Sequence, residues 1–206
     1  MDPNSHEALV RRRDAGRLTW RGPALMLFAR TACAIGAQAL VAAKRTRLGR
    51  DVALGFALIP VSLAFILGGT YAAGWLLYGT LSQPYLFGPL PLPAALYGVL
   101  VFPFIWGLTE QMTYNGYLVS RLQVLGRNTS LAIALVAFPW SAQHAFMPLT
   151  FDPKFMAFRA LSPIPFSVFE AVVYLRLRRL LPFAIAHALM DGASVAIGVL
   201  LPLLRA

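Results

Sequence analysis

The chain has 206 residues, of which 58% are apolar and only 13% are charged, whereas an average soluble domain is about 25% charged. Eighteen basic and eight acidic residues give a formal net charge of +10, and Cys33 is the single cysteine. This composition excludes a disordered chain and a disulfide-built scaffold, and apolar stretches of about twenty residues indicate an integral membrane protein. Because the arginines lie at the ends of these stretches, we expect no nucleic-acid partner.

The first segment, 1–22, is polar and basic, and we expect it to be cytoplasmic. It lacks the short apolar core and small-residue cleavage site of a removable signal peptide. The Ala-rich stretch 23–43 follows, with Arg30 and Gln38 on one helix face. Basic residues flank this stretch on both sides, so it is either a span or an in-plane amphipathic or half-inserted helix.

Apolar segments then alternate with short loops, and we expect crossings at 52–80, 94–119, 130–147, 162–175 and 181–204. Basic residues gather in alternate loops, at 44–50, 121–127 and 176–179, and the positive-inside rule places these loops in the cytoplasm. Asp152 and Arg159 are expected in a loop on the opposite side.

The predicted fold class is therefore all-α, a polytopic transmembrane helix bundle of about five to six spans. We expect one domain over 23–206, in contact with membrane lipid, and we expect it in the plasma membrane of a bacterium. The sequence does not indicate an oligomeric state.

Ionisable side chains inside the expected crossings are Glu110, His144, Glu170, His187 and Asp191. A charge in hydrocarbon costs a few kcal/mol or more, so each of these groups needs a partner or a function. A rise of about 1.5 Å per residue from the cytoplasmic loops puts Glu110 about 15 Å deep and His144 about 20 Å deep. His187 and Asp191 come out at about 10–15 Å. Three helices thus bring polar groups to a similar level, which favours one shared buried site.

Such a group of residues suits hydrolysis of a peptide bond within or next to the membrane. Glu110 and His144, on neighbouring helices, could hold one water molecule, with Glu110 taking its proton and His144 orienting it. His187 and Asp191 are four residues apart and share a helix face, so the pair could stabilise the charge on a carbonyl oxygen.

The run at 109–118, Thr-Glu-Gln-Met-Thr-Tyr-Asn-Gly-Tyr-Leu, resembles the first motif of the CPBP family of intramembrane proteases. In that motif two glutamates are followed by three residues, an arginine, a glycine and an apolar pair. The second motif, an aromatic residue followed four later by His, is matched by Trp140 and His144, where Phe is usual. The family includes type II CAAX prenyl proteases and bacteriocin-processing or self-immunity proteins.

The third motif, His followed four later by Asn or Asp, is matched by His187 and Asp191, so the resemblance covers about 95–195. It implies that Glu110 activates the water with His144 as its partner, and that His187 and Asp191 stabilise the oxyanion. We expect Trp140 and Tyr114 to face lipid or the protein core.

Two positions depart from the family pattern, because Gln111 replaces the second glutamate and Asn115 replaces the arginine. A charged i,i+4 pair has become a neutral hydrogen-bonding pair, which leaves no unpaired charge. We expect both residues to support the site through packing and hydrogen bonds. Glu170 has no motif around it, and we expect it to line the cavity or to pair with an arginine such as Arg176.

The resemblance implies a membrane-embedded endopeptidase that acts on a membrane-associated peptide or protein, prenylated or bearing a sorting signal. Two alternatives stay open: a catalytically impaired scaffold or bacteriocin self-immunity protein, and a small cation or proton carrier. Glu110, His144 and His187 would also make a plausible zinc set. No H-E-x-x-H helix is present, and we expect that no metal is required.

Overall fold

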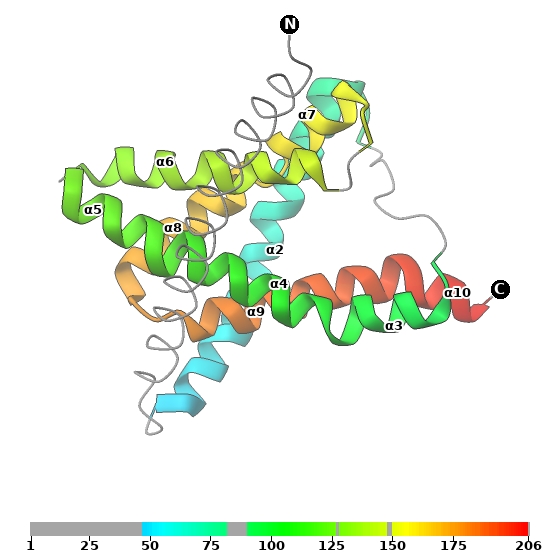
Figure 1. Ribbon diagram of the computed structural model, residues 1–206, viewed down its shortest axis with the longest axis horizontal. Helices are drawn as coiled ribbons and strands as arrows, with labels where there is room; N and C mark the ends of the chain where they lie inside the picture. The colour runs from blue at the N-terminus through cyan, green and yellow to red at the C-terminus, as the bar shows by residue number, and fades with distance from the viewer. Residues whose placement is uncertain (1–46, 82–89, 127, 148–149, 206) are drawn as a thin grey trace, which may run out of the picture.

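The computed structural model describes residues 47–81, 90–126, 128–147 and 150–205, and every regular element in these ranges is a helix (Figure 1). The elements are α2 (Leu48–Tyr78), α3 (Leu92–Leu100), α4 (Phe102–Glu110), η2 (Gln111–Val119), α5 (Ser120–Gly126), α6 (Thr129–Ala142), η3 (Gln143–Phe146), α7 (Pro153–Leu161), α8 (Ile164–Leu177), α9 (Leu181–Val195), η4 (Ala196–Leu200) and α10 (Leu201–Arg205). The predicted all-α bundle is confirmed. The expected segments 1–22 and 23–43 lie outside the described residues.

Four helical stretches are long and apolar enough to cross a membrane: Leu48–Tyr78, Leu92–Gly126, Pro153–Leu177 and Leu181–Leu204. In the first two, only 17% of the most apolar window is buried inside the protein. Their apolar surface therefore faces outward, where lipid tails would cover it. The segment 130–147, which we expected to cross, is the 14-residue α6 continued by the 3-10 helix η3, and it is not among the four.

The expected loop around Asp152 and Arg159 is instead the helix α7, and this expectation was wrong. Asp152 caps the helix, because its Oδ1 accepts hydrogen bonds from the backbone N–H groups of Lys154 at 2.9 Å and Phe155 at 3.3 Å. Pro153 occupies the first turn, where its missing N–H costs nothing. The crossing expected at 162–175 thus begins earlier, and α7 leads almost directly into α8.

The bundle is held by α2 packing on α8 and α9, by α4 packing on α9, and by α6 packing on α8. Figure 1 shows α3 beside α9 and α10 at one end of the molecule, with α5 and α6 joined as a hairpin at the other. Glycines permit the closest approaches, since a Cβ at Gly107 of α4 would lie 3.1 Å from the backbone nitrogen of Ala188 in α9. These contacts bring α4 and α9 together in the interior of the bundle, and η3 follows directly from α6.

An ion pair fixes the beginning of α2 to the connection between α8 and α9. The Asp51 carboxylate, only 1% exposed, accepts a hydrogen bond from Arg179. This hydrogen bond raises the pKa of the Arg179 guanidinium above its ordinary value. Because Arg179 lies two residues before α9, the pair helps to set where that helix enters the bundle.

Candidate active site

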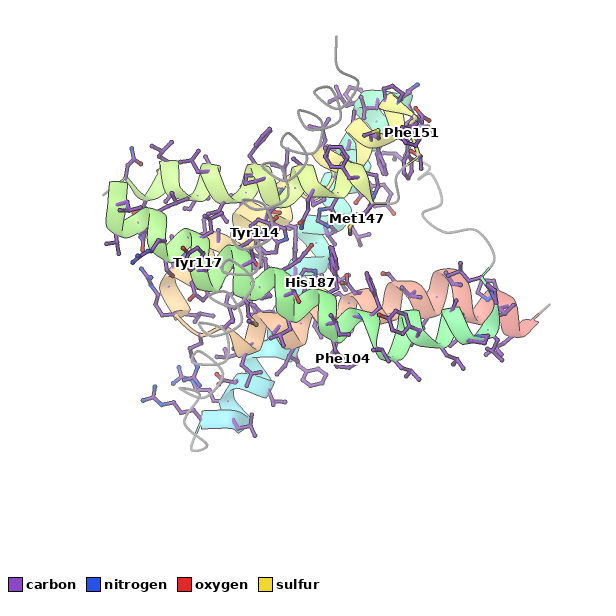
Figure 2. The ribbon with its side chains drawn as sticks, viewed as in Figure 1. Phe104, Tyr114, Tyr117, Met147, Phe151 and His187 are labelled. Carbon is purple, nitrogen blue, oxygen red and sulfur yellow. The ribbon has the colours of Figure 1, made fainter. Side chains whose placement is uncertain are left out.

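Four side chains from three helices meet in the interior of the bundle. His144 Nε2 lies 3.9 Å from Glu110 Oε1, and His187 Nε2 lies 3.6 Å from Glu110 Oε2. His187 Nε2 is also 3.6 Å from Asp191 Oδ2, one turn along α9. Figure 2 shows His187 where α9 lies against α4. The convergence expected from the depth of these residues is therefore observed.

The backbone winds more widely just after Glu110, which ends α4 and is followed by the π-helix η2. π-helical turns are rare and often occur at functional sites. Glu110 and the adjacent Gln111 are both buried, at 3% and 0% exposure, and so is Asn115. This stretch therefore directs the side chains of Glu110, Gln111 and Asn115 into the interior.

Both oxygens of the Glu110 carboxylate accept hydrogen bonds. The indole N–H of Trp140 donates to Oε2 at 2.8 Å, and the amide of Gln143 donates to Oε1. The Tyr114 hydroxyl donates to Gln143 Oε1 at 2.9 Å, and its ring stacks on Trp140 with centroids 5.1 Å apart. Of the expected positions for Trp140, lipid or core, the structure has the core, at 0% exposure. Trp140 and Gln143 hold the carboxylate in a fixed orientation, a contact that the sequence did not suggest.

The tautomer of His144 follows from its hydrogen bond to the backbone. Its Nδ1 lies 3.0 Å from the carbonyl oxygen of Trp140. A carbonyl oxygen can only accept, so Nδ1 carries the hydrogen and, in the neutral ring, Nε2 carries a lone pair. That lone pair is on the nitrogen nearer Glu110. A glutamate oxygen and an imidazole nitrogen thus lie close enough to accept the two protons of one water molecule.

A second buried chain of hydrogen bonds reaches the Nδ1 side of the His187 ring. Asn115 Nδ2 donates to Gln111 Oε1 at 2.7 Å, and Gln111 Nε2 donates to Glu170 Oε2 at 2.9 Å. Ser62 of α2 donates to Glu170 Oε1 at 3.0 Å. Gln111 Nε2 also lies 3.2 Å from His187 Nδ1. The two departures from the family motif therefore form the hydrogen-bonded neutral pair that we expected.

A cavity of about 310 Å³ opens beside these groups, near the lower end of the roughly 300–1,000 Å³ range of ligand pockets. Its polar lining consists of His144, Arg159, His187, Asp191 and Ser194, and its apolar lining of Phe102, Trp106, Phe146, Met147 and Val195. The Arg159 guanidinium donates to the carbonyl oxygen of Met147 through Nε at 3.3 Å and through an Nη at 3.2 Å. Since a guanidinium has five N–H donors, others remain for a ligand in the cavity.

The donor set does not fit a zinc ion. Within the described ranges, no three His, Cys, Asp or Glu side chains are arranged to hold a metal. Glu110, His144 and His187, which the sequence offered as a zinc set, do not form such a group in the described residues.

The part of the chain that carries these residues resembles a known protein family. The family model described as type II CAAX prenyl endopeptidase Rce1-like matches residues 92–193, about half of the chain. The match begins at α3 and ends in α9, so it includes Glu110, His144, His187 and Asp191. No curated protein and no solved structure matches the chain.

Proposed function

Because the chain belongs to the Rce1-like family of type II CAAX prenyl endopeptidases, we propose that it hydrolyses a peptide bond of a membrane-associated substrate. Glu110 and His144 activate the attacking water molecule, and no metal takes part. The observation that carries the proposal is the 3.9 Å distance between Glu110 Oε1 and His144 Nε2, both on the wall of a shared interior region.

Water activation depends on two acceptors with fixed orientations. The water donates one hydrogen bond to Glu110 and one to the Nε2 lone pair of His144, which leaves an oxygen lone pair free for attack. Trp140 and Gln143 hold the carboxylate, and the Trp140 carbonyl holds the imidazole. The carboxylate takes a proton as the new bond from oxygen to the carbonyl carbon forms. Little reorganisation is needed at that moment, which is how preorganised sites lower barriers.

The charge that develops on the carbonyl oxygen is stabilised by His187, which lines the same cavity. Asp191 Oδ2 lies 3.6 Å from the same Nε2, which is too far for a hydrogen bond, but its negative charge favours a proton on that nitrogen. The tetrahedral intermediate collapses when the carbon–nitrogen bond breaks and the proton taken by Glu110 passes to the leaving amine. The products are an amine and a carboxylic acid, which ionises by releasing the second proton of the water, and Glu110 returns to its ionised form.

The cavity indicates the kind of peptide that binds. Phe102, Trp106 and Val195 offer an apolar wall, and Arg159 offers a positive charge. An apolar peptide segment that carries a negative charge, bound to the membrane through a lipid anchor or its own hydrophobic stretch, would complement both features. We propose that the basic loops at 121–127 and 176–179 face the cytoplasm. We also propose that the substrate reaches the site from the membrane, because its lipid anchor or hydrophobic stretch holds it there.

The test is Glu110→Gln in purified protein reconstituted in lipid vesicles, with a farnesylated reporter peptide ending in a four-residue CAAX sequence. We expect cleavage to fall by at least a hundredfold, because the amide keeps the size of the side chain but cannot take a proton. Asp152→Asn is the matched control, because it also replaces a carboxylate by an amide, and asparagine caps helices as well as aspartate does. Undiminished cleavage by the Glu110 variant would contradict the mechanism, and an inactive wild-type protein would favour the scaffold alternative.

A further inference from the structure

Gln111 donates hydrogen bonds in two directions from one amide nitrogen. Its Nε2 lies 2.9 Å from Glu170 Oε2 and 3.2 Å from His187 Nδ1, and both contacts are buried. An amide group has two N–H donors on its nitrogen, one for each of these partners. We propose that Gln111, anchored by Glu170, is the positioning residue that keeps His187 in the tautomer with its hydrogen on Nε2. This inference rests on the proposed function for its catalytic consequence but not for its structural content.

The orientation of the Gln111 amide follows from its three partners. Its oxygen accepts from Asn115 Nδ2 at 2.7 Å, and its nitrogen faces the Glu170 carboxylate, which can only accept when ionised. The Ser62 hydroxyl satisfies the other oxygen of that carboxylate at 3.0 Å. The reversed network would need both amides flipped and Glu170 protonated. The orientation found here suits an ionised Glu170, so the tautomer of His187 is tied to the charge of that carboxylate.

An amide N–H that donates to His187 Nδ1 requires a lone pair on that nitrogen. The ring hydrogen of neutral His187 is then on Nε2, the nitrogen 3.6 Å from Glu110 Oε2 and 3.6 Å from Asp191 Oδ2. His187 lines the cavity, so this N–H is a donor on the side where a substrate carbonyl binds. The other tautomer would present a lone pair to a developing oxyanion and repel it.

Hydrogen bonds to different partners would thus hold His144 and His187 in opposite tautomers. His144 donates from Nδ1 to the Trp140 carbonyl, which leaves a lone pair for the water. His187 accepts at Nδ1 from Gln111, which leaves a donor for the oxyanion. A glutamate at position 111, as in the family motif, would accept at this place and favour a hydrogen on Nδ1. The amide is therefore a functional feature of this chain, and it needs Glu170 as its partner.

The experiment is ¹⁵N NMR of the full-length protein in lipid bilayers, labelled only at histidine. The chain has three histidines, so His6→Ala and His144→Asn variants assign the ring signals. Spectra are recorded well above the titration range of free histidine, about 6.5. We expect protonated Nε2 and unprotonated Nδ1 for His187, and the opposite pattern for His144, which serves as the internal reference. A wild-type His187 that is protonated at Nδ1, or at both nitrogens, overturns the inference.

The exchange Gln111→Glu with Glu170→Gln tests the cause. It reverses donor and acceptor between the two side chains while keeping their number and size. We expect the hydrogen of His187 to move to Nδ1, and kcat for the farnesylated reporter peptide to fall on the order of a hundredfold, with KM within about twofold, as for loss of an oxyanion donor. An unchanged His187 pattern in the folded double variant overturns the inference. If this variant does not fold, the wild-type spectrum still shows which nitrogen of His187 carries the hydrogen.

Ser167→Ala is the matched control, because it breaks a buried hydrogen bond of 3.1 Å to Ser141, one turn before Glu170 on α8, and leaves the hydrogen bonds among Gln111, Glu170 and His187 in place. We expect its His187 pattern and its kcat to equal those of the wild type. A His187 pattern that changes in this control as well would overturn a specific role for Gln111. The NMR result does not depend on cleavage, so failure of the proposed function and failure of this inference give different results.

Discussion

The indole of Trp140 does more for the site than the phenyl ring usual at its motif position could do. It supplies a hydrogen-bond donor to Glu110 Oε2, and its ring is enclosed by Tyr114 and Phe166, with centroids 5.1 Å and 5.8 Å away. Hydrogen bonds to charged groups contribute about 1.5–3 kcal/mol. At this position the second motif therefore holds the base as well as positioning His144.

Trp140→Phe should lower kcat about tenfold without changing KM. The phenyl ring keeps the aromatic packing, whereas the donor to Glu110 is lost, and each 1.36 kcal/mol of barrier is a factor of ten. KM should stay the same because Trp140 does not line the cavity. The measurement is steady-state cleavage of the reporter peptide in vesicles. Trp75→Phe, the same exchange at a side chain 66% exposed on α2, is the control, and equal kcat in both variants would refute the role of the indole.

Arg159→Gln should weaken binding of peptides that carry a negative charge. The amide can still donate to the Met147 carbonyl, but it offers the cavity no positive charge. We expect KM to rise about tenfold for a reporter peptide with a free C-terminal carboxylate, the effect of one charge-assisted hydrogen bond. KM for the same peptide with a C-terminal amide should change little. A parallel rise for both peptides, or none for either, would contradict the prediction, and Arg176→Gln at an exposed position is the control.

The sequence predicted which ionisable residues meet, but not what holds them. Glu110, His144 and His187 could be placed at one depth because membrane helices have a known rise and known ends. Glu170 was expected to line the cavity or pair with Arg176, and it instead binds Ser62 and Gln111. Such contacts join residues 59 and 108 positions apart, and they depend on how helices pack, which local spacing does not encode.

At the scale of the elements, two irregular turns shape the site. The π-helix η2 follows Glu110, and the 3-10 helix η3 carries Gln143 and His144 at the end of α6. Periodicity predicted a helix through both regions but not the change of winding, because the apolar pattern of the sequence does not distinguish a short π or 3-10 turn from an α-helical one. The helix α7 was missed for a different reason. Its polar residues Asp152 and Lys154 suggested a loop, although Asp152 followed by Pro153 is also a helix start.

Gly69→Ala should destabilise the bundle where α2 crosses the junction of α7 and α8. A Cβ at this position would lie 2.1 Å from the carbonyl oxygen of Ser162 and 2.9 Å from Pro165 Cδ, so the helices would have to separate. Overpacking of this kind costs about 1–3 kcal/mol, and we expect the thermal midpoint in detergent to fall by several degrees. Gly68→Ala meets nothing within 4 Å and is the adjacent control. An unchanged midpoint for the Gly69 variant would show that the helices are not this close.

At the scale of the whole molecule, the basic loops require an odd number of crossings between 126 and 153. Leu92–Gly126 ends at one basic loop, and Pro153–Leu177 ends at another, so both stretches run toward the same side. The chain between them must return to the opposite side. Among the described residues of this stretch, the regular elements are α6 and η3. Their 14 α-helical and four 3-10 residues extend about 29 Å, close to the roughly 30 Å of a hydrocarbon core.

We therefore expect residues 126 and 150 to be on opposite sides of the membrane. Cys33 is the single cysteine, so Cys33→Ser gives a cysteine-free background for Gly126→Cys and Thr150→Cys, both at exposed positions. A membrane-impermeant maleimide applied to intact cells should label the Thr150 variant, and should label the Gly126 variant only after the membrane is opened. Detergent-solubilised protein, in which both must react, is the control. Labelling of both variants from one side would mean that α6 and η3 do not cross the membrane. The depth of about 20 Å predicted for His144, which assumed this crossing, would then be wrong.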